Sequence, residues 1–145
     1  MLSWTYQGQP FTSDMIGDNI GFVYQITNLH NGKKYIGKKW FWSTKKLPPL
    51  KGKKRKRTVK KESDWMKYFG SSEEVKLLVE QLGEDNFERE ILRLCKTKGE
   101  CTYYEAKLQF DFEVLLRDDY YNEFIGCKIH SKHLKIDYEE DNIFH

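Results

Sequence analysis

Two short runs near the start of the chain alternate between apolar and polar positions, as half-buried strands do. They cover residues 20–27 and 33–41, and the turn sequence NLHNG separates them. The Asn31-Gly32 pair in that turn favours the positive φ angles of a tight hairpin connection. We therefore predict an antiparallel β-hairpin, with its two tyrosines on a face shared with core residues.

A later segment, residues 71–83, changes from the strand period to the helical period. Its apolar stripe consists of Val75, Leu78, Val79 and Leu82. Ser71 or Ser72 can cap the N-terminus of this helix, and Gly83 is suited to end it. Two glutamates in the first turn complement the helix dipole. The pattern predicts an amphipathic helix.

The remaining periodic segments add one strand and more helix. Residues 86–95 alternate imperfectly and are predicted to be a third strand, and residues 64–68 a short helical turn. Thr97 is a suitable N-cap for a second helix from about Lys98 to Leu116. Together these elements predict an α+β fold, a small three-stranded antiparallel β-sheet flanked by helices.

Length and composition favour one domain over residues 1–145, with its core at about 20–125. A chain of 145 residues with 39% hydrophobic content is long enough for one compact core and short for two. Residues 1–18 show no clear period and are expected to form an irregular arm or a partner-facing segment. Loops and short elements follow the second helix, and the chain ends in an acidic tail over 137–145.

Positive charge is concentrated in one stretch. Twelve Lys or Arg and no acidic residue lie between Lys38 and Lys61, so the rest of the chain carries −9 although the net charge is +3. Such a stripe indicates a polyanionic partner, with a solvated loop as the simpler alternative. Two prolines, a glycine and mutual repulsion predict that residues 43–61 form a long mobile surface loop.

The cysteines and the hydropathy indicate the compartment. Cys95, Cys101 and Cys127 form no CxxC pair and no dense framework, so we expect free thiols in a reducing, cytoplasmic location. No run approaches the roughly 18 apolar residues of a membrane span, and the N-terminus does not look like a signal peptide. We therefore expect no membrane association.

The predicted hairpin carries two tripeptides that resemble a known signature. Phe22-Val23-Tyr24 and Tyr35-Ile36-Gly37 are similar to the paired motifs of the GIY-YIG nuclease family, and the two tyrosines are eleven positions apart. The first motif departs at its glycine, where Phe22 stands. KYFGSSEEVKLLVEQLGEDNFEREILRLC, CTYYEAKLQF and the later YYN follow in the order seen in phage and homing-type members.

This resemblance implies a metal-dependent DNA endonuclease that hydrolyses phosphodiester bonds. Glu105 falls on the family's essential glutamate and would bind Mg²⁺ or Mn²⁺. Tyr24 and Tyr35 would activate or orient the attacking water, helped by a neighbouring lysine and the metal that lower a phenol pKa. Lys38 would hold the phosphate, and Tyr68 would take the place of a later tyrosine. The simpler interpretation of the two motif tyrosines is sheet aromatics packed on the core.

The resemblance also has a departure. Many members carry an arginine eight residues after the second motif's glycine, where this chain has Lys45 followed by the Pro-Pro break. A cation of the basic stretch is then expected to contact DNA in its place. The expected DNA-binding residues are Gly37, Lys39, Lys45, Lys53, Lys54, Arg55, Arg57, Lys60 and Asn122.

Two other functions fit the same residues. A domain that kept the fold but lost the arginine would bind nucleic acid without cleaving it. Alternatively, the basic run is a tether and the folded part binds protein. For a nuclease of this size we expect a monomer or weak homodimer, low or structure-based specificity, and action in the host cytoplasm if a phage encodes it.

Overall fold

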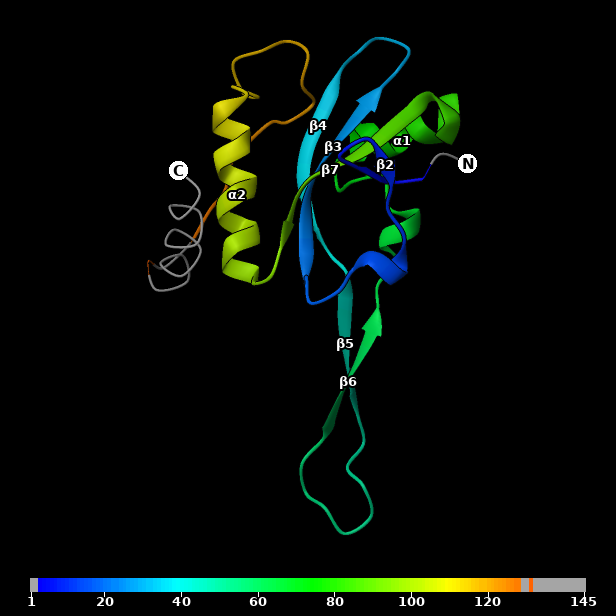
Figure 1. Cartoon of the computed structure of the whole chain (residues 1–145), viewed down its shortest axis with the longest axis vertical. Coiled ribbons are helices and arrows are strands. Elements are labelled where there is room, and N and C mark those ends of the chain that lie inside the picture. The colour runs from blue at the N-terminus through cyan, green and yellow to red at the C-terminus, as the bar shows by residue number, and fades with distance from the viewer. Residues whose placement is uncertain (1–2, 129–130, 132–145) are drawn as a thin grey trace.

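The computed structural model describes residues 3–128 and 131, so the predicted acidic tail lies outside the described residues. The described part is an α+β fold with a mixed five-stranded sheet, a separate two-stranded ribbon and two α-helices (Figure 1). The strands are β1 (Thr5–Tyr6), β2 (Gln9–Pro10), β3 (Gly21–Asn28), β4 (Lys34–Trp40), β5 (Trp42–Leu47), β6 (Arg57–Glu62) and β7 (Phe87–Cys95). The α-helices are α1 (Glu73–Leu82) and α2 (Lys98–Asp111), and the short 3-10 turns are Ser13–Met15, Trp65–Lys67 and Glu84–Asn86.

The main sheet has the strand order β2-β1-β7-β3-β4. The three predicted strands β3, β4 and β7 are present, and β3 pairs antiparallel with both neighbours. The prediction of a purely three-stranded antiparallel sheet was wrong, because β1 adds to β7 in parallel and β2 pairs with β1. In this order β4 is an edge strand.

The N-terminal segment is part of the folded body and not an irregular arm. Gln7 and Gly8 have φ angles of 53° and 81°, which form the tight turn between β1 and β2. Trp4, Phe11 and Ile16 are buried in the core. Strands of two residues are too short to show a period, so the pattern of hydrophobicity could not reveal them.

The sheet has a hydrophobic cluster on each face. Phe22, Tyr24 and Ile26 face α1 and the N-terminal segment, whereas Val23 and Ile36 face α2. Figure 1 shows the two helices on opposite sides of the sheet. Residues of β3 and β4 therefore point alternately into two cores, and side chains at the β4 edge can reach the surface beside either.

The predicted helix caps are confirmed. Ser72 Oγ accepts a hydrogen bond from Val75 N at 3.3 Å, and Thr97 Oγ1 accepts one from Glu100 N at 3.1 Å. Gly83, with φ at 91°, follows α1 as predicted. Helix α2 ends at Asp111 and not at residue 116, and soon afterwards the chain turns through Glu113, whose φ is 55°.

The basic stretch forms a hairpin and not a mobile loop. Strands β5 and β6 pair antiparallel from Trp42 opposite Glu62 to Leu47 opposite Arg57, and Figure 1 shows the ribbon extending away from the body. The two prolines and Gly52 follow β5, so they end the strand without preventing it. Because every cation on the strands is exposed to solvent or half-buried, water screens their repulsion.

The three cysteines carry free thiols, as expected from the sequence. Among the described residues, no helix has both the length and the apolar character to cross a membrane.

Candidate active site

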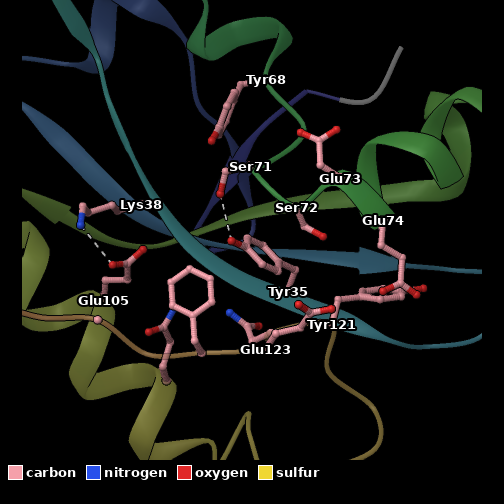
Figure 2. Close-up of a pocket in the computed structure, with 14 residues that line it drawn as sticks. Tyr35, Lys38, Tyr68, Ser71, Ser72, Glu73, Glu74, Glu105, Tyr121 and Glu123 are labelled. Carbon is pink, nitrogen blue, oxygen red and sulfur yellow. Dashed lines mark hydrogen bonds and ion pairs between the residues drawn. The ribbon is translucent and has the colours of Figure 1, made fainter.

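A cavity of about 550 Å³ opens at the β4 edge of the sheet (Figure 2). It lies between β4, the first turn of α1 with the residues before it, α2, and the segment that follows Tyr120. The lining residues are Tyr35, Lys38, Tyr68, Ser71, Ser72, Glu73, Glu74, Glu105, Gln109, Tyr121, Asn122, Glu123, Phe124 and Gly126. Four of the five predicted catalytic residues therefore line one cavity.

Lys38 and Glu105 form an ion pair inside this cavity. Lys38 Nζ of β4 lies 3.2 Å from Glu105 Oε1 of α2, and the side chains are only 28% and 15% exposed. Burial raises the pKa of Glu105, although the neighbouring Lys38 opposes the shift. A cation beside a partly desolvated carboxylate is an arrangement that can hold a phosphate next to a metal ligand.

The hydroxyl of Tyr35 approaches the cavity from the other side of β4. Tyr35 Oη and Ser71 Oγ are 3.0 Å apart and share a hydrogen bond. The expectation that a neighbouring lysine lowers the Tyr35 pKa was wrong, because burial raises that pKa. Tyr35 and Lys38 are three positions apart on a strand and so project to opposite faces, where Lys38 pairs with Glu105.

Tyr68 lines the cavity, whereas Tyr24 lies beneath it. The two rings pack edge to face with centroids 5.9 Å apart, and Lys39 Nζ sits 4.2 Å from the Tyr68 ring centroid. Tyr24 is fully buried and is not among the lining residues. Desolvation raises the pKa of Tyr24 well above its usual value, with Tyr68 and Tyr35 adding to the shift. A catalytic role for Tyr24 stays a prediction.

Gly37 and Asn122 are placed where they shape the cavity. A Cβ at Gly37 would collide with the Tyr24 hydroxyl, so a glycine is needed for the two tyrosine rings to pack here. Asn122 accepts a hydrogen bond from Ile36 N at 3.0 Å and donates one to Ile36 O at 2.8 Å. The amide of Asn122 therefore continues the hydrogen-bonding of the edge strand, and its contact with DNA stays a prediction.

The other predicted DNA-binding residues are not among those that line the cavity. Lys39 pairs with Asp64 Oδ1 at 2.7 Å. The exposed side chains of the β5–β6 hairpin include Lys45, Lys53, Lys54, Arg55, Arg57 and Lys60. Of the described residues, Lys38 is the one Lys or Arg that lines the cavity. The family arginine therefore has no counterpart in the described lining, and Lys45 lies on the exposed ribbon.

The family model described as "Putative endonuclease segE, GIY-YIG domain" matches residues 4–125. The chain belongs to the GIY-YIG endonuclease family. It is 37% identical over 101 residues to "Putative endonuclease segE" of Enterobacteria phage T4, which is 70% of this chain and 39% of that protein. It is 33% identical over 104 residues to "Putative endonuclease segD" of the same phage, 72% of this chain and 37% of that protein.

The chain thus spans about two fifths of the length of these curated relatives. No solved structure matches it. The family match extends to the N-terminal β1–β2 turn, which lies outside the predicted core of residues 20–125.

Several cavity residues of this GIY-YIG domain were missed by sequence reasoning. Ser71 was considered only as a helix cap, yet it bonds Tyr35. Gln109 follows Glu105 by four positions on α2, and its Nε2 donates to Ile36 O at 2.9 Å. That helical spacing to the glutamate was a usable signal. The carboxylates of Glu73, Glu74 and Glu123 also line the cavity, with no pattern that would have selected them.

The donor set of this GIY-YIG domain fits a hard divalent cation. No group of three or more His, Cys, Asp or Glu side chains arranged to hold a metal occurs in the described part of the chain. Mg²⁺ keeps several waters and often needs only one or two protein carboxylates, so Glu105 would be sufficient to hold such an ion. The cavity is also large enough for the remaining ligands to be water and substrate.

Proposed function

We propose that this domain is a metal-dependent DNA endonuclease that hydrolyses phosphodiester bonds with Mg²⁺ or Mn²⁺, encoded by a phage and of low or structure-based specificity. The observation that carries the proposal is the meeting of Tyr35, Lys38, Tyr68 and Glu105 in one cavity. Membership of the GIY-YIG family supports the same reaction.

The chemistry requires an activated water and stabilisation of negative charge on a phosphate and its leaving oxygen. A divalent cation held by Glu105 would supply Lewis acidity toward the phosphate. Lys38 pairs with the Glu105 carboxylate in the free protein. On substrate binding, its ammonium group would form an ion pair with the phosphate instead. Tyr35 and Ser71 form a neutral hydroxyl pair that can orient the water by hydrogen bonding, and the raised pKa of Tyr35 favours this over a phenolate.

The basic ribbon would supply affinity for DNA that does not depend on sequence. Neutralising phosphates releases counterions, so affinity falls as salt rises. Contacts to about six phosphates would give a slope of log K against log salt of roughly −5. The same salt dependence is expected whether or not the domain cleaves.

The deciding experiment incubates the purified protein with supercoiled plasmid, with and without Mg²⁺ or Mn²⁺. Wild type should give nicked or linear product only with metal, and Glu105→Ala should give none. Glu80→Ala, which removes an exposed charge on α1 outside the cavity, is the matched control and should cleave as wild type does. A monomer that nicks one strand gives mainly nicked circles, whereas a dimer cutting both gives linear DNA early.

One observation favours a second function, a nucleic-acid-binding module without activity. The position of the family arginine is occupied by Lys45 on the exposed ribbon. If wild type binds the plasmid and leaves it intact with every metal tested, this second function replaces the first.

A further inference from the structure

The β5–β6 ribbon is an exposed two-stranded hairpin that is separate from the main sheet. It projects from the body in Figure 1, and its side chains are exposed along almost the whole of both strands. An isolated two-stranded hairpin is at best marginally stable in water. Docking against a partner would therefore stabilise this element.

The strand pairing sorts the ribbon side chains into two different faces. Thr44 lies opposite Lys60 and Lys46 opposite Thr58, so these four share one face, called here the donor face. Each of these four side chains can donate a hydrogen bond, and the same face ends at the base of the ribbon with Trp42 opposite Glu62. The opposite face carries two apolar residues, Leu47 and Val59, which interrupt its four polar side chains, Ser43, Lys45, Arg57 and Lys61.

The donor face continues into a groove on the body. A cavity of about 290 Å³ at the base of the ribbon is lined by Ile20, Lys39, Trp40, Trp42, Ser43, Thr44, Lys60, Ser63 and Lys98. Lys60 Nζ lies 4.9 Å from the Trp42 ring centroid, and Lys98 Nζ lies 5.7 Å from that of Trp40. Ribbon and body thus present one continuous basic surface on the donor-face side.

We propose that the ribbon enters the major groove of double-stranded DNA, with its donor face toward the base edges and the basal groove along the adjoining backbone. The inference rests on the proposed function in taking DNA as the substrate. The major groove, about 12 Å wide, admits a two-stranded ribbon, whereas the minor groove of about 6 Å does not. Lysine and threonine are suited to the acceptors N7 and O6 of guanine.

Two features favour a duplex over a single strand. Proteins that bind single strands stack bases on aromatic side chains, and the donor face has no aromatic residue beyond Trp42 at its base. The hairpin tip instead adds five cations, Lys51, Lys53, Lys54, Arg55 and Lys56. Strands of six residues span about 20 Å, which places this tip far enough from the basal groove to reach a second phosphate backbone.

The test is binding of the full chain to a mixed-sequence DNA duplex in EDTA, followed by dimethyl sulfate footprinting. The reagent methylates guanine N7 in the major groove and adenine N3 in the minor groove, so it reports which groove is covered. Protection of guanine N7 is expected. Because no metal is present, a protein that fails to cleave plasmid can still pass this test, and an active nuclease can fail it.

Two double variants, each lacking two lysines, distinguish the contribution of the donor face from that of the opposite face. Lys46→Ala with Lys60→Ala should remove the N7 protection and weaken duplex binding at least about tenfold. Lys45→Ala with Lys61→Ala should keep the protection while the salt slope falls by up to about 2. Circular dichroism checks that both remain folded.

The other outcomes overturn the proposal. Protection of adenine N3 alone would place the protein in the minor groove. Protection of neither base, or equal effects of the two variants on N7, would mean that the ribbon contacts only the backbone. Absence of duplex binding would remove the ribbon from DNA recognition altogether.

Discussion

Lys38 and Glu105 meet between the edge strand β4 and helix α2, with Lys38 Nζ 3.2 Å from Glu105 Oε1. The two residues are 67 positions apart in the chain. Their pairing links the second tyrosine motif to the helix that carries the proposed metal ligand. In the free protein, the lysine lowers the pKa of a carboxylate that burial would otherwise shift further upward.

Replacing Lys38 with methionine should raise the pKa of Glu105 further, because the variant loses the cation and keeps the burial. Metal-dependent cleavage at neutral pH should fall about 10²-fold, as for other lost charge-stabilising groups. The acidic limb of the pH–rate profile should also move to higher pH. A profile that keeps its position while only the rate falls would mean that Lys38 acts on the phosphate alone.

The raised pKa of Glu105 also predicts how stability depends on pH. Below the usual value of 4.5 the carboxyl is protonated in the folded and the unfolded protein, so burial costs nothing. As the pH rises from there through the folded pKa, the unfolded chain releases its proton first and the folded state loses stability. Glu105→Gln cannot ionise at this position, so wild type should lose melting temperature relative to the variant over that window.

Thermal unfolding of both proteins, measured in steps from about pH 4 to 8, checks this sign. A melting-temperature difference that stays constant, or grows in favour of wild type, would contradict a pKa raised by burial.

Part of the site was accessible from the sequence and part was not. The motif spacing and the helix caps were local signals, so β3, β4, α1 and the start of α2 were predicted. The pairing of Lys38 with Glu105 depends on how α2 packs on the sheet, and no local pattern contains that. Likewise, Ser71 meets Tyr35 only because the chain before α1 returns to the β4 edge.

The β5–β6 ribbon was not predicted from the sequence, for a different reason. Charge repulsion and two prolines argued against regular structure over residues 43–61, yet the prolines lie just beyond β5. Strand pairing set the outcome, because Lys45 faces Val59 and Lys46 faces Thr58 without like charges directly opposite. The register that spaces these charges cannot be known until the hairpin turn is placed.

Replacing Tyr35 with phenylalanine should test the hydroxyl apart from the ring. The ring still packs against Tyr24, with centroids 6.3 Å apart in wild type, so the melting temperature should change little. Cleavage should fall about 10²-fold or more, the usual effect of a positioned acid–base or water-orienting group. Ser71→Ala removes only the hydrogen-bond partner and should have a smaller effect. Equal losses in both variants would mean that the pair acts as one unit.

For Tyr24, removal of the hydroxyl is expected to leave the stability of the protein unchanged or to raise it. Within the described part of the chain its hydroxyl is buried and makes no hydrogen bond of good geometry, while the nearby Tyr68 adds to the rise in its pKa. Removing an unsatisfied buried hydroxyl is neutral or stabilising, so Tyr24→Phe should unfold at the same or a higher temperature. If this variant keeps its stability but loses cleavage, the hydroxyl serves the reaction, and full activity would assign Tyr24 to packing.

Asn122→Ala should loosen the edge strand that carries the site. The substitution removes both hydrogen bonds to Ile36 and leaves Ile36 N without its partner from Asn122, although Gln109 still donates to Ile36 O. Leaving such a group unsatisfied in a buried position costs about 1–3 kcal/mol. Denaturant unfolding should show this loss, and amide exchange of β4 should quicken more than that of β7. Asn122→Asp keeps an acceptor for Ile36 N but, when ionised, sets a carboxylate oxygen against Ile36 O, so it should lose less than Asn122→Ala only at a pH low enough to protonate it. Equal losses at such a pH would contradict a role for the Ile36 hydrogen bonds.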